Sequence, residues 1–313
     1  MNCDRLTRWL YPIAGFLLLV FSLHVLQQEL ERYDSQDILQ SLSSLGDRQL
    51  FAAFGLVFFD YLVISSYDLI AFRHFNYCLD TPKILFTTFI TYAVSNTTGF
   101  TLLIGGAIRY RFYSLWHVPG KKIAQITAFG NLTFWLGLLT LTGITFAIDP
   151  LQLPVFLKVG ALASRYLGVA ALILVVIYFY CCWRIKRLKI ERKIFRFPKP
   201  ITSLIQIAIF ASDWAIAAAV LYCLIPDYLG KSYFQFFNVY LLSMATSIIS
   251  SVPGGIGVFE TVIIFLLPQD IFTPDILSAL LVYRAIRFLL PLAIAAIAVC
   301  CFELNRRFGA TKR

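Results

Sequence analysis

Charged residues are scarce in this sequence. Asp, Glu, Lys and Arg make up 14% of its 313 residues, whereas hydrophobic residues make up 59%. Soluble domains carry about 25% charged residues, so the composition excludes an ordinary soluble domain. Together with a mean hydropathy of +0.76, it predicts an all-α polytopic membrane protein.

Motifs for cofactors are missing as well. The seven cysteines show no CxxC spacing and stand beside no histidine cluster, so a metal centre or a disulfide framework has no support. Gly230-Lys231-Ser232 matches the end of a phosphate-binding loop, but Ile225 stands where that motif needs its first glycine. We therefore expect no metal, no nucleotide or other cofactor, and no nucleic-acid partner.

Long apolar windows dominate what is present. A helix of about 20 apolar residues crosses a hydrocarbon core of roughly 30 Å. The first window follows Arg5 and Arg8, and we interpret it as a retained span because no small-x-small cleavage site follows Leu26. The eight windows run approximately over 10–26, 50–72, 84–108, 123–148, 159–183, 203–225, 234–267 and 277–302.

The distribution of basic residues predicts the topology. Cytoplasmic loops are enriched in Lys and Arg, and 184–199 holds eight of them against the single acid Glu191. The segments 73–83, 109–122 and 306–313 are also basic, whereas 27–49 is acidic. If all eight windows crossed, 109–122 would fall on the wrong side. Windows 84–108 and 234–267 are therefore predicted to be re-entrant hairpins, with six full spans and both termini in the cytoplasm.

The order span, span, hairpin, span then occurs twice with opposite orientation. We predict a single membrane domain over 1–313, with inverted-repeat halves at about 1–150 and 151–305 and a basic tail at 306–313. The glycine pairs Gly105/Gly106 and Gly254/Gly255 are expected at the two hairpin tips, which would meet near the midplane. Broken backbone at that depth is tolerated only inside protein or beside a wet cavity.

The second hairpin carries the sharpest local signal. Pro253 lacks a backbone donor, and Gly254, Gly255 and Gly257 permit turn conformations and close approach; the alternative is a packing kink. Helix N-termini at the tips favour anionic groups. The candidate substrate-binding residues are Asn96, Gly105, Gly106, Arg109, Arg111, Pro253, Gly254, Gly255, Gly257, Glu260, Arg284 and Arg287.

Ionisable residues inside apolar windows need partners, because a charge at the bilayer centre is costly. Arg284 and Arg287, three residues apart on one helical face, either bind a phosphate headgroup or form a structural ion pair with Glu260. The coupling candidates are Asp60, Asp68 and Asp213; the alternative for these acids is burial beside Arg, Tyr or Asn. Arg109 and Arg111 either anchor the topology or attract anionic lipid.

The segments SNTTGFTLLIGGAIRYRFYSLWHVPG at 95–120, SVPGGIGVFE at 251–260 and YRAIRFLLPL at 283–292 resemble the flippase-like membrane region of lysylphosphatidylglycerol synthases, and in particular stand-alone inner-membrane proteins of the YbhN type. This resemblance implies a lipid flippase-like fold in the inner (plasma) membrane. Because the sequence stops at Arg313, without room for an aminoacyl-transfer domain, we expect no enzymatic activity.

Three functions remain open at this point. The first is a carrier that moves an anionic phospholipid or a polyprenyl-phosphate-linked lipid between leaflets. The second is a secondary transporter of a small hydrophilic solute. The third is a non-transporting scaffold for a lipid-modifying enzyme. The expected partners are anionic lipids, together with either a second copy of the chain or such an enzyme.

Overall fold

The computed structural model describes residues 40, 45–98, 101–148, 161–184, 187–190, 193–196, 198–225, 232–250, 253–267 and 273–311. The predicted first span, 10–26, lies outside these residues. The long helices are α3 (Asp47–His74), α6 (Gly120–Ile148), α7 (Ala161–Arg184), α8 (Pro200–Leu224) and α12 (Leu290–Thr311). The shorter helical elements are α4 (Thr81–Thr98), α5 (Thr101–Leu115), α9 (Tyr233–Ser250), η3 (Pro253–Gly255), α10 (Val258–Leu266), α11 (Thr273–Arg284) and η4 (Ala285–Leu289).

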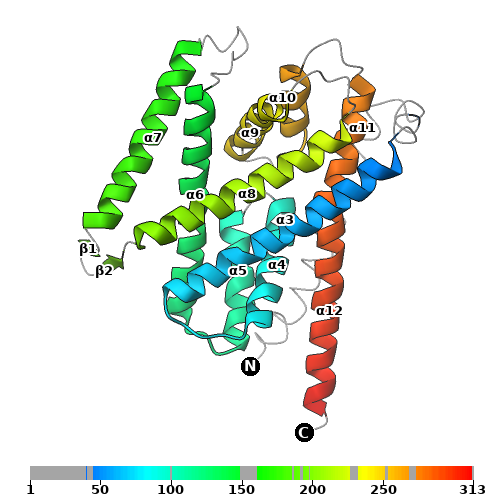
Figure 1. Ribbon diagram of the computed structural model, residues 1–313. Helices are drawn as coiled ribbons and strands as arrows, with labels where there is room; N and C mark the ends of the chain where they lie inside the picture. Colours follow the sequence, from blue (N-terminus) through cyan, green and yellow to red (C-terminus); the bar gives the residue numbers. More distant parts are fainter. Residues whose placement is uncertain are drawn as a thin grey trace.

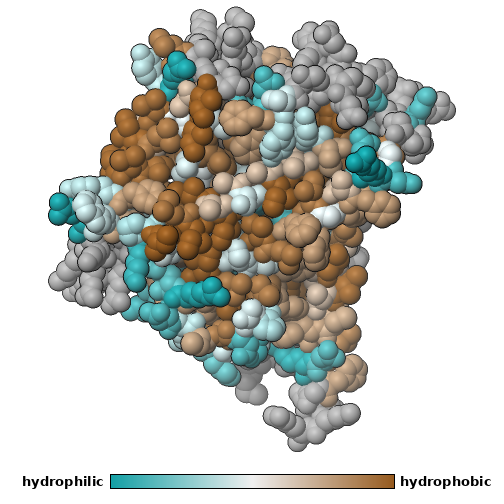
Figure 2. All heavy atoms as spheres, in the orientation of Figure 1, coloured by the Kyte–Doolittle hydropathy of each residue, from teal (hydrophilic) through white to brown (hydrophobic). Residues whose placement is uncertain are grey.

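Five of these segments are long and apolar enough to cross a membrane, namely 47–74, 120–148, 165–184, 200–224 and 275–308. They coincide with five of the windows predicted as full spans. Many of their large apolar side chains are exposed, such as Phe58, Ile173, Val176 and Ile297. Figure 2 shows the resulting hydrophobic band across the middle of one face. A multi-pass membrane protein accounts for these outward-facing side chains, because lipid rather than water would cover them.

The two windows predicted as hairpins are each divided into two helices that pack on one another. In the first, α4 ends at Thr98 and α5 begins at Thr101. In the second, α9 and α10 flank the short helix η3. Figure 1 shows α3 and α8 running obliquely side by side through the molecule, with α9–α10 on one side of them and α4–α5 on the other.

The glycine pair of the first hairpin is not at its tip. Gly105 and Gly106 lie inside α5, and a Cβ on Gly105 would stand 3.2 Å from Ser95 Oγ and 3.3 Å from Thr91 Cγ2 of α4. Gly105 therefore permits the close approach of the two helices, a role that a short side chain serves in any packed helix pair. The predicted correspondence between the two glycine pairs is wrong in this respect.

The helical prediction is confirmed except in the basic segment 184–199. There, β1 (Arg187–Ile190) and β2 (Lys193–Arg196) pair as an antiparallel hairpin. Basic and apolar residues alternate along β1, Arg187-Leu188-Lys189-Ile190, a period-2 pattern that suits a strand. The two strands together have only eight residues, so a search for apolar windows long enough to span a membrane does not detect them.

Basic groups gather at one end of the helices. Lys122 Nζ, near the start of α6, donates to the carbonyl of Phe75 at the end of α3, 3.2 Å away. Arg111 of α5 pairs with Glu303 near the end of α12 at 2.5 Å. These contacts bring the termini of four helices together. They also place residues of the predicted cytoplasmic segments on the same side of the molecule.

Candidate functional site

The site is built where the two broken windows meet. A Cβ on Gly254 would lie 2.8 Å from the carbonyl oxygen of Thr97, in the last turn of α4, so η3 and the end of α4 are in direct contact. Any L side chain at Gly254 would push the two segments apart. The two interrupted windows therefore touch, and the end of α4 rather than Gly105 and Gly106 supplies the contact with Gly254.

Three glycines shape the second tip. Gly254, Gly255 and Gly257 have φ angles of 63°, 62° and 80°, in the left-handed region that other residues adopt only at a cost. A Cβ on Gly255 would also collide with the side chain of Ser247 in α9. The sequence GGIG is thus required both by backbone conformation and by packing.

Glu260 holds the start of α10. Its Oε2 accepts a hydrogen bond from the backbone N–H of Gly257 at 2.8 Å, which satisfies one of the free donors at the helix N-terminus. Its Oε1 accepts one from Arg284 Nε. The same guanidinium donates through Nη1 to the carbonyl of Gly254 at 3.2 Å and reaches that of Gly255 at 3.5 Å. Arg284 and Glu260 therefore fasten the tip to α11.

Arg287 points elsewhere. It lies in the π-helical turn η4, where the wider turn rotates successive side chains away from their α-helical positions. Arg284 and Arg287, expected on one helical face, consequently reach different partners. Arg287 Nη1 donates to Asp60 Oδ2 of α3, and Nη2 donates to Asp213 Oδ1 of α8 at 3.3 Å. One arginine thus joins two acids that lie 153 positions apart in the sequence.

This second group, Asp60, Asp213 and Arg287, is buried, with residue exposures of 0%, 7% and 5%. Tyr67 donates its hydroxyl to Asp213 Oδ2 at 3.0 Å, and Tyr61 donates to the backbone carbonyl of Arg287 at 3.4 Å. Two polar atoms, Asp60 Oδ1 and Arg287 Nε, are buried without a hydrogen-bond partner among the described residues. We call these three residues the Asp–Arg–Asp cluster.

Asp68 and Arg109 form a separate, matched pair. Arg109 Nε and Nη2 both donate to the Asp68 carboxylate, at distances of 2.8 to 3.1 Å, in the forked geometry that guanidinium and carboxylate share. The Tyr113 hydroxyl donates to the same acid at 2.7 Å, and Arg109 lies over the ring of Tyr92. This pair ties α3 to the first hairpin.

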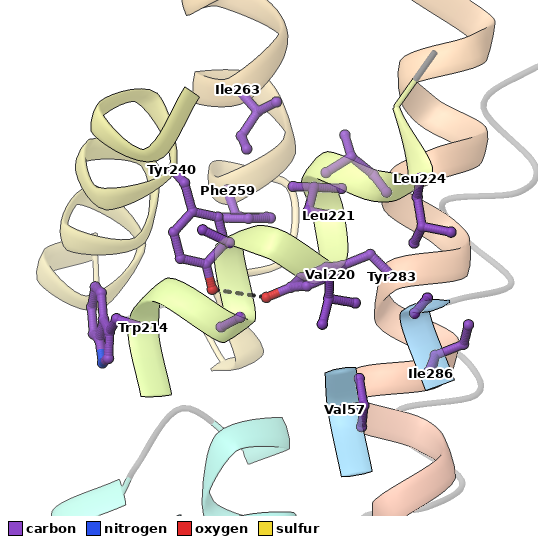
Figure 3. Packing of buried hydrophobic residues seen from close by; sticks show 14 of the residues in the cluster. Val57, Trp214, Val220, Leu221, Leu224, Tyr240, Phe259, Ile263, Tyr283 and Ile286 are labelled. Carbon is purple, nitrogen blue, oxygen red and sulfur yellow. Dashed lines mark hydrogen bonds between the residues drawn. The ribbon is translucent and has the colours of Figure 1, made fainter. Parts of the chain in front are cut away.

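Apolar and aromatic side chains close the site on the side of the second hairpin. Figure 3 shows the hydroxyls of Tyr240 in α9 and Tyr283 in α11 pointing at one another, 2.8 Å apart. Phe259 stacks on Tyr283 with ring centroids 6.0 Å apart, and Leu221 of α8 covers the pair. Each hydroxyl thereby has a hydrogen-bond partner in buried surroundings that offer little water.

The structure brings part of the predicted set together. Gly254, Gly255, Gly257, Glu260 and Arg284 form one continuous tip. Asn96 is partly buried in the last turn of α4, one residue from the Thr97 carbonyl that meets Gly254. Pro253 opens η3. Gly106 lies within α5, and Arg111 is engaged with Glu303 at the basic end.

The acids predicted as coupling candidates lie in two groups, with Asp60 and Asp213 in the cluster and Asp68 with Arg109. Sequence reasoning did not single out Tyr61, Tyr67, Tyr240, Tyr283 or Ser247. Three of these tyrosines are sequence neighbours of candidate residues, namely Tyr61 beside Asp60, Tyr67 beside Asp68 and Tyr283 beside Arg284. A buried tyrosine beside a buried charge is the signal that would have found them.

Comparison with known proteins gives one consistent result. The family model for the lysylphosphatidylglycerol synthase TM region matches residues 9–295. An uncharacterized Synechocystis sp. protein, slr0712, is 42% identical over 293 residues, covering 93% of this chain and 90% of that protein. The Escherichia coli inner membrane protein YbhN is 31% identical over 302 residues, covering 96% and 92%. A Staphylococcus aureus phosphatidylglycerol lysyltransferase is 24% identical over 284 residues, covering 90% of this chain and 32% of that protein.

Proposed function

The chain belongs to the lysylphosphatidylglycerol synthase transmembrane-region family, and on that premise we propose that it moves an anionic lipid between the leaflets of a membrane. The lipid is a phospholipid or a polyprenyl-phosphate-linked species. We propose transport as the activity of this membrane region, because its interrupted helices are of the kind that transporters place around a central site. Transport by this fold needs a site at membrane depth that can be reached from both sides.

The observation that carries the proposal is the contact between Gly254 and the end of α4 beside the partly buried Arg284. Helices interrupted within the membrane leave polar backbone groups that lipid cannot satisfy, and transporters use such half-helices around a central site. Here two interrupted segments, one from each half, meet at Gly254 and Thr97. A fold that only anchored a protein would have no need of either interruption.

We further propose six full spans with two re-entrant hairpins that enter from opposite sides. The placement of α4–α5 and α9–α10 on opposite sides of α3 and α8 supports this arrangement. The basic end around Lys122 and Arg111 is proposed to be cytoplasmic, following the positive-inside rule. The C-terminus then lies in the cytoplasm, because Glu303 and Arg306 of α12 are at that end.

Of the three arginines paired with acids inside the helix bundle, Arg284 is the one that a headgroup would reach first. Its side chain is 15% exposed, against 6% for Arg287 and 4% for Arg109. Glu260 is its ion-pair partner, and the remaining donors face the weaker carbonyl acceptors of Gly254 and Gly255. A phosphate presents more acceptor oxygens than these carbonyls. We infer that the headgroup displaces Arg284 from the carbonyls and loosens the tip.

The relative named phosphatidylglycerol lysyltransferase suggests the first lipid to test. We propose phosphatidylglycerol and its close anionic analogues as substrates. The purified protein is reconstituted into vesicles containing headgroup-labelled phosphatidylglycerol, phosphatidylethanolamine or a polyprenyl phosphate. A membrane-impermeant quencher is added outside the vesicles. Translocation is measured as the rate at which labelled lipid from the inner leaflet reaches the outer leaflet and is quenched. We expect faster exchange of an anionic lipid than of the zwitterionic one.

The matched variants are Arg284→Gln and Arg306→Gln. The second removes an arginine of α12 whose side chain is 41% exposed at the basic end, and it controls for the loss of one positive charge. Arg284→Gln should slow the exchange at least tenfold while the protein remains monodisperse in detergent. Equal rates in vesicles with and without the wild-type protein, for every lipid tested, would contradict the proposed function.

A further inference from the structure

The Asp–Arg–Asp cluster has unequal numbers of acidic and basic groups. Arg287 is the one cation within ion-pair distance of Asp60 and of Asp213 in the described part of the chain. With both carboxyls ionised, the three residues carry a net charge of −1 in a core that excludes water. A buried charge without compensation is strongly disfavoured and is usually neutralised by binding a proton.

Asp68 and Arg109 show what a balanced site looks like in the same protein. There, one guanidinium meets one carboxylate through both Nε and Nη2, and Tyr113 supplies a further donor. In the cluster, by contrast, the two Nη atoms of Arg287 are divided between two acids. Asp60 Oδ1, in a residue with 0% exposure, accepts no hydrogen bond from any residue that the structure describes.

The described residues around the cluster supply no second cation. The ionisable groups that face the cluster are hydroxyl-bearing, and they come from several elements. They are Tyr61 and Tyr67 of α3, Tyr92 of α4, Tyr240 of α9 and Tyr283 of α11. The Tyr67 hydroxyl donates its hydrogen bond to Asp213 Oδ2, and the hydroxyls of Tyr240 and Tyr283 hydrogen-bond to each other. Arg287 holds the Asp60 and Asp213 carboxyls on its two Nη atoms, and two carboxyl groups brought together in this way bind each other only when one is protonated.

We propose that Asp60 and Asp213 bind one proton between them, which makes this cluster a proton site shared by α3 and α8. The proton completes a carboxyl–carboxylate hydrogen bond, and Arg287 compensates the remaining charge. A metal cation is disfavoured there because the Arg287 guanidinium already contacts both acids and would repel a second cation. No cluster of three or more His, Cys, Asp or Glu that could hold a metal occurs among the described residues.

This site lies where the predicted halves of the chain meet. Asp60 comes from the first half, Asp213 and Arg287 come from the second, and α3 and α8 make one of the two most extensive helix contacts in the described part of the chain. Loss of the proton would leave two carboxylates to repel each other across that contact. Resting on the function proposed above, we infer that proton binding and release bias the two arrangements of the halves and couple lipid movement to a proton gradient.

Infrared spectroscopy of the reconstituted full-length protein tests the proton itself. A protonated carboxyl shows a C=O stretch that a carboxylate lacks, and labelling with [4-13C]aspartate assigns that band to aspartate. We expect the wild type at neutral pH to show a labelled band, which shifts in D2O. Asp60→Asn and Asp213→Asn should each abolish it, because the two acids share one proton. Asp68→Asn should leave it in place.

Several outcomes overturn the proposal. They are a wild-type spectrum without a labelled band, a band that only Asp68→Asn removes, or stabilisation of the protein by sodium but not by choline, which would indicate a metal cation instead. The wild-type measurement decides the point even if the Asn variants do not fold. None of these results depends on lipid movement.

Translocation in vesicles with an imposed pH gradient then tests the coupling. We expect the gradient to change the wild-type rate several-fold and Asp213→Asn to remove that dependence. A labelled band without lipid movement supports the proton site and contradicts the proposed function. Lipid movement that ignores the gradient, in a protein without the band, contradicts the proton site and leaves the proposed function standing.

Discussion

Replacing Gly255 by alanine tests how the second tip is built. Gly255 has a φ of 62°, and an alanine held there costs about 1 to 2 kcal/mol in backbone strain. The new methyl would also collide with the Ser247 side chain, and overpacking of this kind costs about 1 to 3 kcal/mol. We therefore expect Gly255→Ala to lower the free energy of unfolding by about 2 to 5 kcal/mol.

The collision can be separated from the strain by changing Ser247. The ideal Cβ on Gly255 lies 2.9 Å from Ser247 Cβ but 3.9 Å from its Cα, so alanine at 247 keeps the overlap and glycine removes it. When Gly255→Ala is combined with Ser247→Gly, removal of the overlap should restore about 1 to 3 kcal/mol of the free energy of unfolding. The new glycine inside α9 should itself cost roughly 0.5 to 1 kcal/mol of that gain. Ser247→Ala should recover little.

Reversible unfolding of the detergent-solubilised protein with sodium dodecyl sulfate measures these differences. Gly106→Ala in α5 is the matched control, because its Cβ would stand at an ordinary 3.6 Å from Thr127 Cγ2 of α6. It should be neutral or stabilising by up to about 1 kcal/mol. A Gly255→Ala protein as stable as the wild type, or equal rescue by alanine and glycine at 247, would refute this account of the tip.

Three further predictions concern ion pairs and use the same unfolding assay. Glu260→Gln keeps an acceptor for the Gly257 N–H but removes the charge opposite Arg284. Because those side chains are 10% and 15% exposed, we expect the free energy of unfolding to fall by less than the roughly 3 to 5 kcal/mol typical of breaking a fully buried ion pair. A variant as stable as the wild type would show that the charge is dispensable. Arg109→Lys loses the forked contact with Asp68 and should cost about 1.5 to 3 kcal/mol, the worth of a hydrogen bond to a charged group; no loss would mean that the fork is unimportant. Glu303→Gln removes a partly exposed pair and should cost at most about 1 kcal/mol, so a larger effect would contradict its peripheral role.

The windows and their interruptions follow from the sequence because each depends on neighbouring residues only. A run of apolar residues forms a helix wherever lipid or protein covers it, as in 120–148 and 200–224. Pro253-Gly254-Gly255 breaks its window by local backbone chemistry, which is the reason the break was predicted at its observed position. Gly105 shows the limit of such reasoning, since a glycine inside a helix and a glycine at a turn look alike until the facing helix is known.

For the ionisable residues, too, the sequence determines one part of the answer and the packing of the helices determines the other. Composition alone made it certain that acids such as Asp60 would need partners, because the membrane interior offers no water to solvate them. It did not say which partners. Glu260 and Arg284 are 24 residues apart, within two successive apolar windows, and their pairing was among the alternatives that the sequence left open.

What the sequence determined by itself is a membrane protein with two interrupted windows and a basic end. What only the tertiary structure decided is that Arg287, rather than sharing a face with Arg284, turns in a π-helix toward Asp60 and Asp213. The physical reason is that local patterns fix where a chain is apolar or broken, whereas the pairing of charges 74 and 227 residues apart depends on how α3, α8 and η4 pack.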